Sequence, residues 1–177
     1  FLAKADKPIL MVVVAGETSR AQNWSLGGYG RDTNPDLAKR DIVYYPNATS
    51  CGTATATSLP CMFSPLTRSE YSYEGGLGHE NLVDVLTHAG FKVEWWDNNT
   101  GDKDIADRIP SRKMKPEDGP EFCFPECIDG VFLKGLQDKA DTITQNTVIV
   151  MHQIGSHGPS YWLRYPPERE LFKPACH

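Results

Sequence analysis

The sequence lacks several features that would place it in common functional classes. Its 177 residues carry 18 Lys and Arg against 23 Asp and Glu, so a net charge of -5 excludes the basic surface expected of a nucleic-acid-binding protein. No run of about 18 apolar residues occurs, so no segment is expected to span a membrane. The first residues lack the charged start and apolar core of a signal peptide, and we expect the chain to be a piece of a longer protein.

The five cysteines contain no C-x-x-C pair, which argues against a dithiol redox motif and a zinc knuckle. They predict two short-range disulfides instead, Cys51–Cys61 and Cys123–Cys127, and these indicate an oxidising compartment. Cys176 is left over. Either it is free or its partner lies beyond the last residue of this chain, and we favour the second interpretation.

Alternating strand and helix patterns predict an α/β fold: a mostly parallel sheet with helices on both faces, in a three-layer arrangement. Apolar runs rich in β-branched residues indicate buried strands over Pro8–Ala15 and Thr147–His152, and further strands over Ile42–Pro46 and Phe91–Trp96. Start signals and apolar spacing indicate helices over Thr33–Arg40, His79–Ala89, Asp102–Pro110 and Ile128–Ala140. In the last helix the expected buried residues are Val131, Phe132, Leu133 and Leu136. Residues 111–125 are expected to form a surface excursion.

The segment from Ser50 to Cys61 is a run of small hydroxyl residues bracketed by cysteines. Ser50 or Thr53 could cap a short helix that begins there. A helix N-terminus suits an anion such as phosphate, and a hydroxyl beside it could attack phosphorus or coordinate a metal. The alternative is a Thr/Ser-rich loop closed by a disulfide.

Three polar clusters each follow a predicted strand: Glu17, Thr53 with Thr55, and His152 with His157. Because the carboxyl ends of parallel strands meet at one edge of a sheet, these clusters are expected to converge there. A carboxylate and a threonine alkoxide around a metal describe a nucleophile for phosphoryl or sulfuryl transfer.

Each of these residues also has a structural interpretation. Glu17 could be a helix-start carboxylate that faces solvent. His157 could be a loop histidine bonded to backbone. Lys103, after the Asn98-Asn99 turn, could pair with a phosphate, but it could also be an ordinary solvated lysine.

Five ordered motifs carry a family resemblance. They are Val14–Arg20 (VAGETSR), Ser50–Thr55 (SCGTAT), Pro60–Ser64 (PCMFS), Asp97–Asn99 (DNN) and Gly155–Pro159 (GSHGP). From about Ile9 to its end, the chain resembles the periplasmic catalytic domain of lipid A phosphoethanolamine transferases. That family includes the mobile colistin-resistance enzymes and belongs to the alkaline phosphatase/sulfatase superfamily.

The resemblance implies roles for individual residues. Glu17 matches a zinc-binding glutamate, and Thr55, rather than Thr53, matches the nucleophile that becomes modified with phosphoethanolamine. His157 matches a histidine near the substrate phosphate or a second zinc, so the implied Zn2+ ligands are Glu17, Thr55 and His157. Further positions linked to substrate binding are Lys103 and Glu70. The disulfide implied to brace the nucleophile helix joins Cys51 to Cys61.

The resemblance also implies the reaction and its setting. Phosphoethanolamine would pass from phosphatidylethanolamine to Thr55, releasing diacylglycerol, and then to a phosphate of lipid A, which confers resistance to polymyxin and other cationic peptides. Residues 1–177 would be the N-terminal part of one periplasmic domain of a monomeric protein anchored in the inner membrane. The family's transmembrane helices and its later Asp-His zinc ligands are absent from this sequence, so we expect this chain to be inactive alone.

Two alternatives stay open. One is a zinc-dependent hydrolase, a phosphodiesterase or sulfatase, that uses the same nucleophile. Because a sulfatase usually carries Cys or Ser at the nucleophile position, the Thr-Ala-Thr sequence argues against that enzyme. The other alternative is a non-catalytic periplasmic fragment held together by disulfides.

Overall fold

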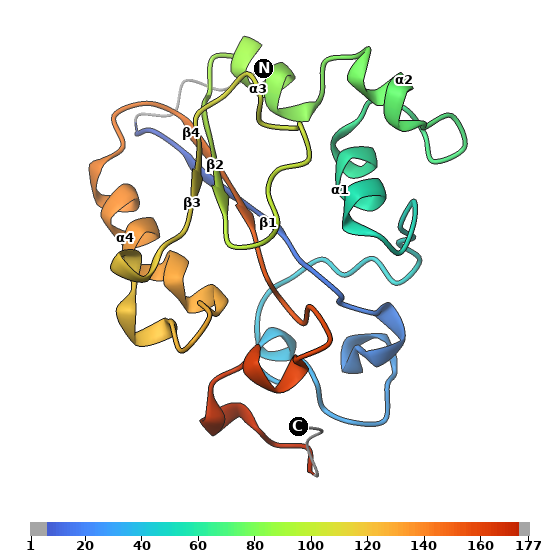
Figure 1. Ribbon diagram of the computed structural model, residues 1–177, viewed down its shortest axis with the longest axis vertical. Coiled ribbons are helices and arrows are strands. Elements are labelled where there is room, and N and C mark those ends of the chain that lie inside the picture. The colour runs from blue at the N-terminus through green and yellow to red at the C-terminus, as the bar shows by residue number, and fades with distance from the viewer. Residues whose placement is uncertain (1–6, 174–177) are drawn as a thin grey trace.

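The computed structural model describes residues 7–173, which form a parallel sheet with helices on both faces (Figure 1). Its strands, in the spatial order β1-β4-β2-β3, are β1 (Leu10–Ala15), β4 (Thr147–His152), β2 (Lys92–Asp97) and β3 (Ser111–Lys113). All neighbouring pairs are parallel. Ala15 and Asp97 both pair in register with His152, so three strands end at the same edge of the sheet. The predicted α/β class is therefore confirmed.

Strand β4 is the centre of the fold, and all six of its residues are buried. Because side chains alternate along a strand, β4 contributes to two separate cores. Val148 and Val150 pack with α1 and α3 on one face, whereas Ile149 and Met151 pack with α4 on the other. Figure 1 shows α4 and α1 on opposite sides of the strands.

The helices are short. The α-helices are α1 (Thr55–Phe63), α2 (Tyr73–Leu77), α3 (Leu82–His88) and α4 (Phe132–Thr142). Single 3-10 turns occur at Ala21–Asn23, Ser25–Gly27, Leu37–Lys39, Pro116–Asp118, Pro120–Phe122, Asp129–Val131, Tyr161–Leu163 and Pro167–Arg169. Within residues 7–173, none of the helices has the length and apolar character needed to cross a bilayer.

Helix α3 illustrates how local sequence sets these boundaries. The Asn81 side chain accepts a hydrogen bond from the backbone N–H of Val83, and Asp84 accepts one from the N–H of Asn81, which forms a capping box. The helix therefore begins later than the predicted His79. It ends at His88, and Gly90 follows shortly after with a φ of +88°, which glycine adopts at little cost.

Two strand predictions need correction. The strand that ends at Ala15 is parallel as predicted, but it is only partly buried, because it lies at an edge of the described sheet. Ala15 is 2% exposed, whereas Val14 is 52% exposed. The predicted strand Ile42–Pro46 does not form, since no described strand runs beside it. Val43 points to solvent, and Tyr44 stacks on Trp24 instead.

The helix predictions also differ in detail. Residues 33–40 form only the turn Leu37–Lys39. Residues 102–110 form turns instead of a helix, because Lys103 and Asp104 both adopt positive φ. Strand β3 lies in the region predicted to be a surface excursion. Cys176 lies outside the described residues.

The predicted buried face of α4 is partly wrong. Phe132 and Val131 are buried, and Leu136 packs against them, but Leu133 is 58% exposed. Phe132 and Leu136 lie four residues apart on one face of α4, so the adjacent Leu133 is turned out of that face.

This contrast gives a test of the core. We expect Phe132→Ala to lower the free energy of unfolding by about 3–5 kcal/mol, as large-to-small changes in a packed core do. The neighbouring Leu133→Ala should change it by no more than about 0.5 kcal/mol, as surface substitutions usually do. Urea unfolding followed by tryptophan fluorescence measures both, and equal losses would contradict the assigned face.

Candidate active site

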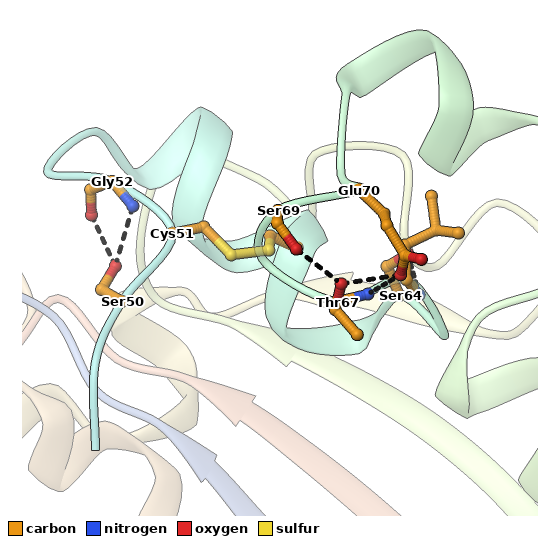
Figure 2. Close-up of a disulfide and its surroundings, with 9 residues drawn as sticks. Ser50, Cys51, Gly52, Ser64, Thr67, Ser69 and Glu70 are labelled. Atoms are coloured by element: carbon orange, nitrogen blue, oxygen red, sulfur yellow. Dashed lines mark hydrogen bonds between the residues drawn. A yellow bond between two sulfur atoms is a disulfide. The ribbon is translucent and has the colours of Figure 1, made fainter. Parts of the chain in front are cut away.

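Thr55 is the first residue of α1, at the point where the chain turns from an extended conformation at Ala54 into the helix. No side chain caps this helix, so the predicted caps are wrong. The Ser50 hydroxyl instead bonds within its own turn, to the backbone of Gly52, and Thr53 is exposed (Figure 2). The uncapped first turn leaves its N–H groups available to an anion.

Helix α1 is anchored on both sides. The predicted disulfide between Cys51 and Cys61 ties the preceding turn to the body of the helix (Figure 2). Leu59 and Phe63 are buried in the core, where the Phe63 ring lies 5.5 Å from Trp95. Thr55 therefore has a fixed position relative to the sheet.

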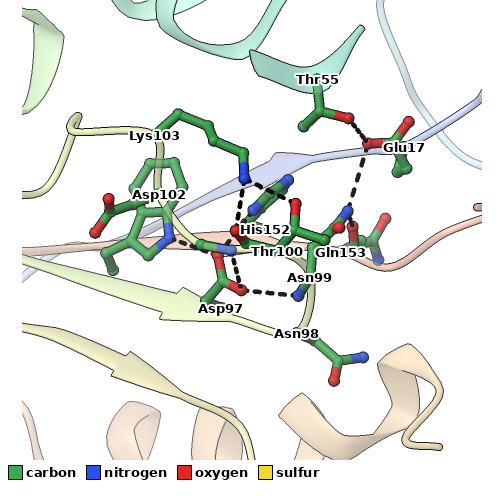
Figure 3. A network of polar contacts seen from close by, with 12 residues as sticks. Glu17, Thr55, Asp97, Asn98, Asn99, Thr100, Asp102, Lys103, His152 and Gln153 are labelled. Carbon is green, nitrogen blue, oxygen red and sulfur yellow. Dashed lines mark hydrogen bonds and ion pairs between the residues drawn. The ribbon is translucent and has the colours of Figure 1, made fainter.

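Glu17 meets Thr55 at the carboxyl edge of the sheet (Figure 3). The Thr55 hydroxyl donates a hydrogen bond of 2.6 Å to Glu17 Oε2, and the Thr18 hydroxyl donates one of 2.8 Å to Oε1. Partial burial alone would raise the pKa of Glu17, but these hydrogen bonds and the nearby charge of His157 outweigh it and lower the pKa. Glu17 is therefore a carboxylate at neutral pH.

The turn after β2 packs against this pair through Asn99. Its side-chain amide donates to the backbone oxygen of Gln153 at 2.7 Å and to Glu17 Oε2 at 3.4 Å (Figure 3). The other atom of that amide, Oδ1, is buried and has no hydrogen-bond partner within residues 7–173. Asn99 thus brings an unpaired acceptor close to Glu17 and Thr55.

Asp97 stabilises the conformation of this turn through hydrogen bonds to its backbone. Its carboxylate accepts hydrogen bonds from the backbone N–H groups of Asn99 at 2.8 Å and Gly101 at 3.2 Å. His152 Nδ1 lies 2.8 Å from its other oxygen. Burial would raise the pKa of Asp97, but the contact with His152 and the N–H donors lower it. His152 is only 1% exposed, and through this contact with Asp97 it supports the turn.

His157 lies in the loop after β4, half-buried. Its Nδ1 is 2.7 Å from the backbone oxygen of Gly158, and Arg164 donates to its backbone oxygen. In the same loop Gly155 contacts the Glu17 backbone so closely that a Cβ atom there would lie 2.6 Å from the Glu17 oxygen. The loop that carries His157 is therefore packed directly on Glu17.

The two remaining predicted residues form their hydrogen bonds with other residues. The Lys103 ammonium donates to the backbone oxygen and hydroxyl of Thr100 in the turn after β2 (Figure 3). Glu70 is exposed in the loop after α1, where its carboxylate accepts hydrogen bonds from Thr67 (Figure 2). Neither side chain is hydrogen-bonded to Glu17 or Thr55.

The sequence analysis assigned no role at the site to Asp97 or Asn99, which it named only as part of the Asp97–Asn99 motif. The signal that could have found them is the one that indicated Glu17, namely their position at the carboxyl end of a strand in a parallel sheet: Asp97 is the last residue of β2, and Asn99 lies in the turn that follows.

A complete metal site is not present in the described part of the chain, since residues 7–173 hold no group of three or more His, Cys, Asp or Glu placed to bind an ion. What Glu17 and Thr55 provide is a pair of adjacent oxygen atoms, one of them ionised.

A family model and individual relatives both match nearly the whole of this chain. Residues 10–177 match the Sulfatase family. The chain is 47% identical over 176 residues to phosphoethanolamine transferase EptA of Salmonella typhimurium, and 41% identical over 179 residues to phosphatidylethanolamine transferase Mcr-1 of Escherichia coli. These matches cover 99% and 96% of this chain but 32% and 33% of the relatives, so the chain spans about a third of their length.

Among solved structures, the soluble domain of lipooligosaccharide phosphoethanolamine transferase A from Neisseria meningitidis superposes with a TM-score of 0.90 at 39% identity. The match covers 98% of this chain and 53% of that domain. The described fold thus corresponds to about half of a known domain.

The hydrogen bond between Thr55 and Glu17 can be tested by titration. Thr55→Val removes the donor that lowers the pKa of Glu17, so we expect that pKa to rise. NMR titration of the Glu17 carboxyl carbon measures the change. Thr53→Val, an exposed change in the same segment, should leave the pKa unaltered; an equal effect of both variants would contradict the geometry.

Proposed function

The chain belongs to the sulfatase family, and because its relatives there include phosphoethanolamine transferases, we propose that the protein containing it is such a transferase. Phosphoethanolamine passes from phosphatidylethanolamine to Thr55 and from there to a phosphate of lipid A. The observation that supports this proposal most directly is the Thr55 hydroxyl at the uncapped start of α1, hydrogen-bonded to an ionised Glu17.

The proposed roles follow from this geometry. Glu17 accepts the Thr55 hydrogen bond and so fixes the direction in which the hydroxyl oxygen points. A phosphoryl group attacked by that oxygen would face the first N–H groups of α1, whose partial positive charge stabilises its oxygens. The Thr55 hydroxyl gives up its proton and its oxygen bonds to phosphorus, while the bond to the diacylglycerol oxygen breaks and that oxygen takes up a proton. In the second half, a lipid A phosphate oxygen bonds to phosphorus, the bond from phosphorus to Thr55 breaks, and the Thr55 oxygen regains a proton.

We propose Zn2+ as the cofactor. Glu17 and Thr55 fit it as two oxygen ligands, because the atoms are adjacent and Glu17 is ionised, and His157 is the candidate third ligand. Zinc sites use about three or four protein ligands, so the others would come from outside residues 7–173. When bound, the ion would lower the pKa of the Thr55 hydroxyl.

The remaining assignments are also proposals. Lys103, Glu70 and His157 bind the substrate headgroup or its phosphate.

The chain is part of one periplasmic catalytic domain of a monomeric protein anchored in the inner membrane. Two disulfides, Cys51–Cys61 and Cys123–Cys127, support an oxidising compartment. Added ethanolamine groups would reduce the negative charge of lipid A and with it the binding of polymyxin.

The test is transfer activity of the full-length protein with labelled phosphatidylethanolamine and lipid A. We expect Thr55→Ala to lose transfer by at least about a hundredfold, because a covalent route needs its nucleophile. Thr53→Ala, two residues earlier, should retain activity within about twofold, as a surface change does.

Three outcomes would contradict the proposal. Full activity of Thr55→Ala would remove Thr55 from the mechanism. Transfer of the label to water in place of lipid A would make the protein a hydrolase. No release of diacylglycerol by the unsubstituted protein would indicate a non-catalytic domain.

A further inference from the structure

We propose that Asp129 is a positioning residue that joins the two loops flanking Glu17 and so holds Glu17 and Thr55 in register. The inference rests on the proposed function, because it assigns Asp129 to the same site. The two loops are the turn of residues 97–101 after β2 and the loop of residues 153–157 after β4. Asp129 itself starts the 3-10 turn that precedes α4.

The Asp129 carboxylate is shared between both loops. Its Oδ1 atom accepts a hydrogen bond of 3.0 Å from the Asn98 side-chain amide and one of 2.9 Å from the backbone N–H of Ile154. Its Oδ2 atom accepts one of 2.8 Å from the N–H of Gly155. One side chain from the α4 face thus connects the ends of β2 and β4.

Both connections lead to Glu17. Gly155 lies against the Glu17 backbone, and the next N–H, that of Ser156, donates to the Glu17 backbone oxygen at 3.3 Å. From the other loop, Asn99 reaches the Glu17 carboxylate and also binds Gln153. A shift of either loop would therefore move the carboxylate that orients Thr55.

The loop closed by the Cys123–Cys127 disulfide also contacts these residues. The Asn98 amide that reaches Asp129 also donates to the backbone oxygen of Cys127 at 3.1 Å. Arg164 pairs with the Glu126 carboxylate and donates to the backbone oxygen of His157. Asn98 thus links Asp129 to residue Cys127, and Arg164 links Glu126 to the loop that carries His157.

Asparagine is the informative replacement at this position. Asp129→Asn keeps the size of the side chain but replaces an acceptor oxygen by an NH2 group, which faces N–H donors it cannot accept from. We expect the loop of residues 153–157 to shift. Because a misplacement of about 1 Å can cost up to about a hundredfold in rate, kcat should fall at least about tenfold with little change in KM.

The experiment measures kcat and KM of lipid A modification by the full-length protein for Asp129→Asn, together with its thermal unfolding. Asp138→Asn is the matched control, because Asp138 is an exposed residue of α4 that pairs with Lys134 and lies outside the site. It should keep kcat within about twofold. Asn98→Ala, which removes the partner of Asp129 in the turn after β2, should also lower kcat.

The outcomes separate the inference from the proposed function. A selective fall in kcat in Asp129→Asn and Asn98→Ala, with the unfolding temperature retained, supports positioning. An unchanged kcat, a rise in KM alone, or a loss matched by Asp138→Asn overturns it. If Asp129→Asn does not fold, an unchanged kcat in Asn98→Ala overturns it. Failure of the proposed function is a different result, in which Thr55→Ala remains active.

Discussion

The hydrogen bond between Thr55 and Glu17 is the interaction on which the rest of the site depends. It joins the start of α1 to the segment that follows β1, across 38 positions of sequence. The positions of both residues depend on contacts with other parts of the chain. Thr55 is fixed by a helix that a disulfide and two buried side chains anchor, and Glu17 by loops packed on both its backbone and its carboxylate.

The sheet makes this possible because its strands end together. β1, β2 and β4 are in register at Ala15, Asp97 and His152, so the polar residues that follow share one edge. The apolar cores on the two faces hold the strands, while carboxylates order the loops above them. Asp97 organises one turn and Asp129 the contact between turns. At this edge the hydrogen bonds between strands have ended, and the side-chain oxygens of Asp97 and Asp129 accept hydrogen bonds from the backbone N–H groups of the loops instead.

The sequence alone predicts the fold class and the main pair of the candidate site, but not the contacts that support that pair. The parallel α/β class and the proximity of Glu17 to Thr55 follow from strand patterns and the common edge of parallel strands. Strand β1 was expected to be buried, but a strand's own residues do not say that it lies at an edge. The supporting contacts were not predictable either, since Asn99 meets Glu17 across 82 positions and Asp129 meets Ile154 across 25. Loop polar residues carry no periodic signal that would reveal such partners.

The most direct measurement of the central claim is peptide mass mapping of the full-length protein after incubation with phosphatidylethanolamine and without acceptor. The account predicts a phosphoethanolamine group on the peptide that contains Thr55, located on that residue by fragmentation and lost when lipid A is added. A modification on Thr53 or Ser58, or transfer to lipid A with no modified peptide at any time, would contradict it.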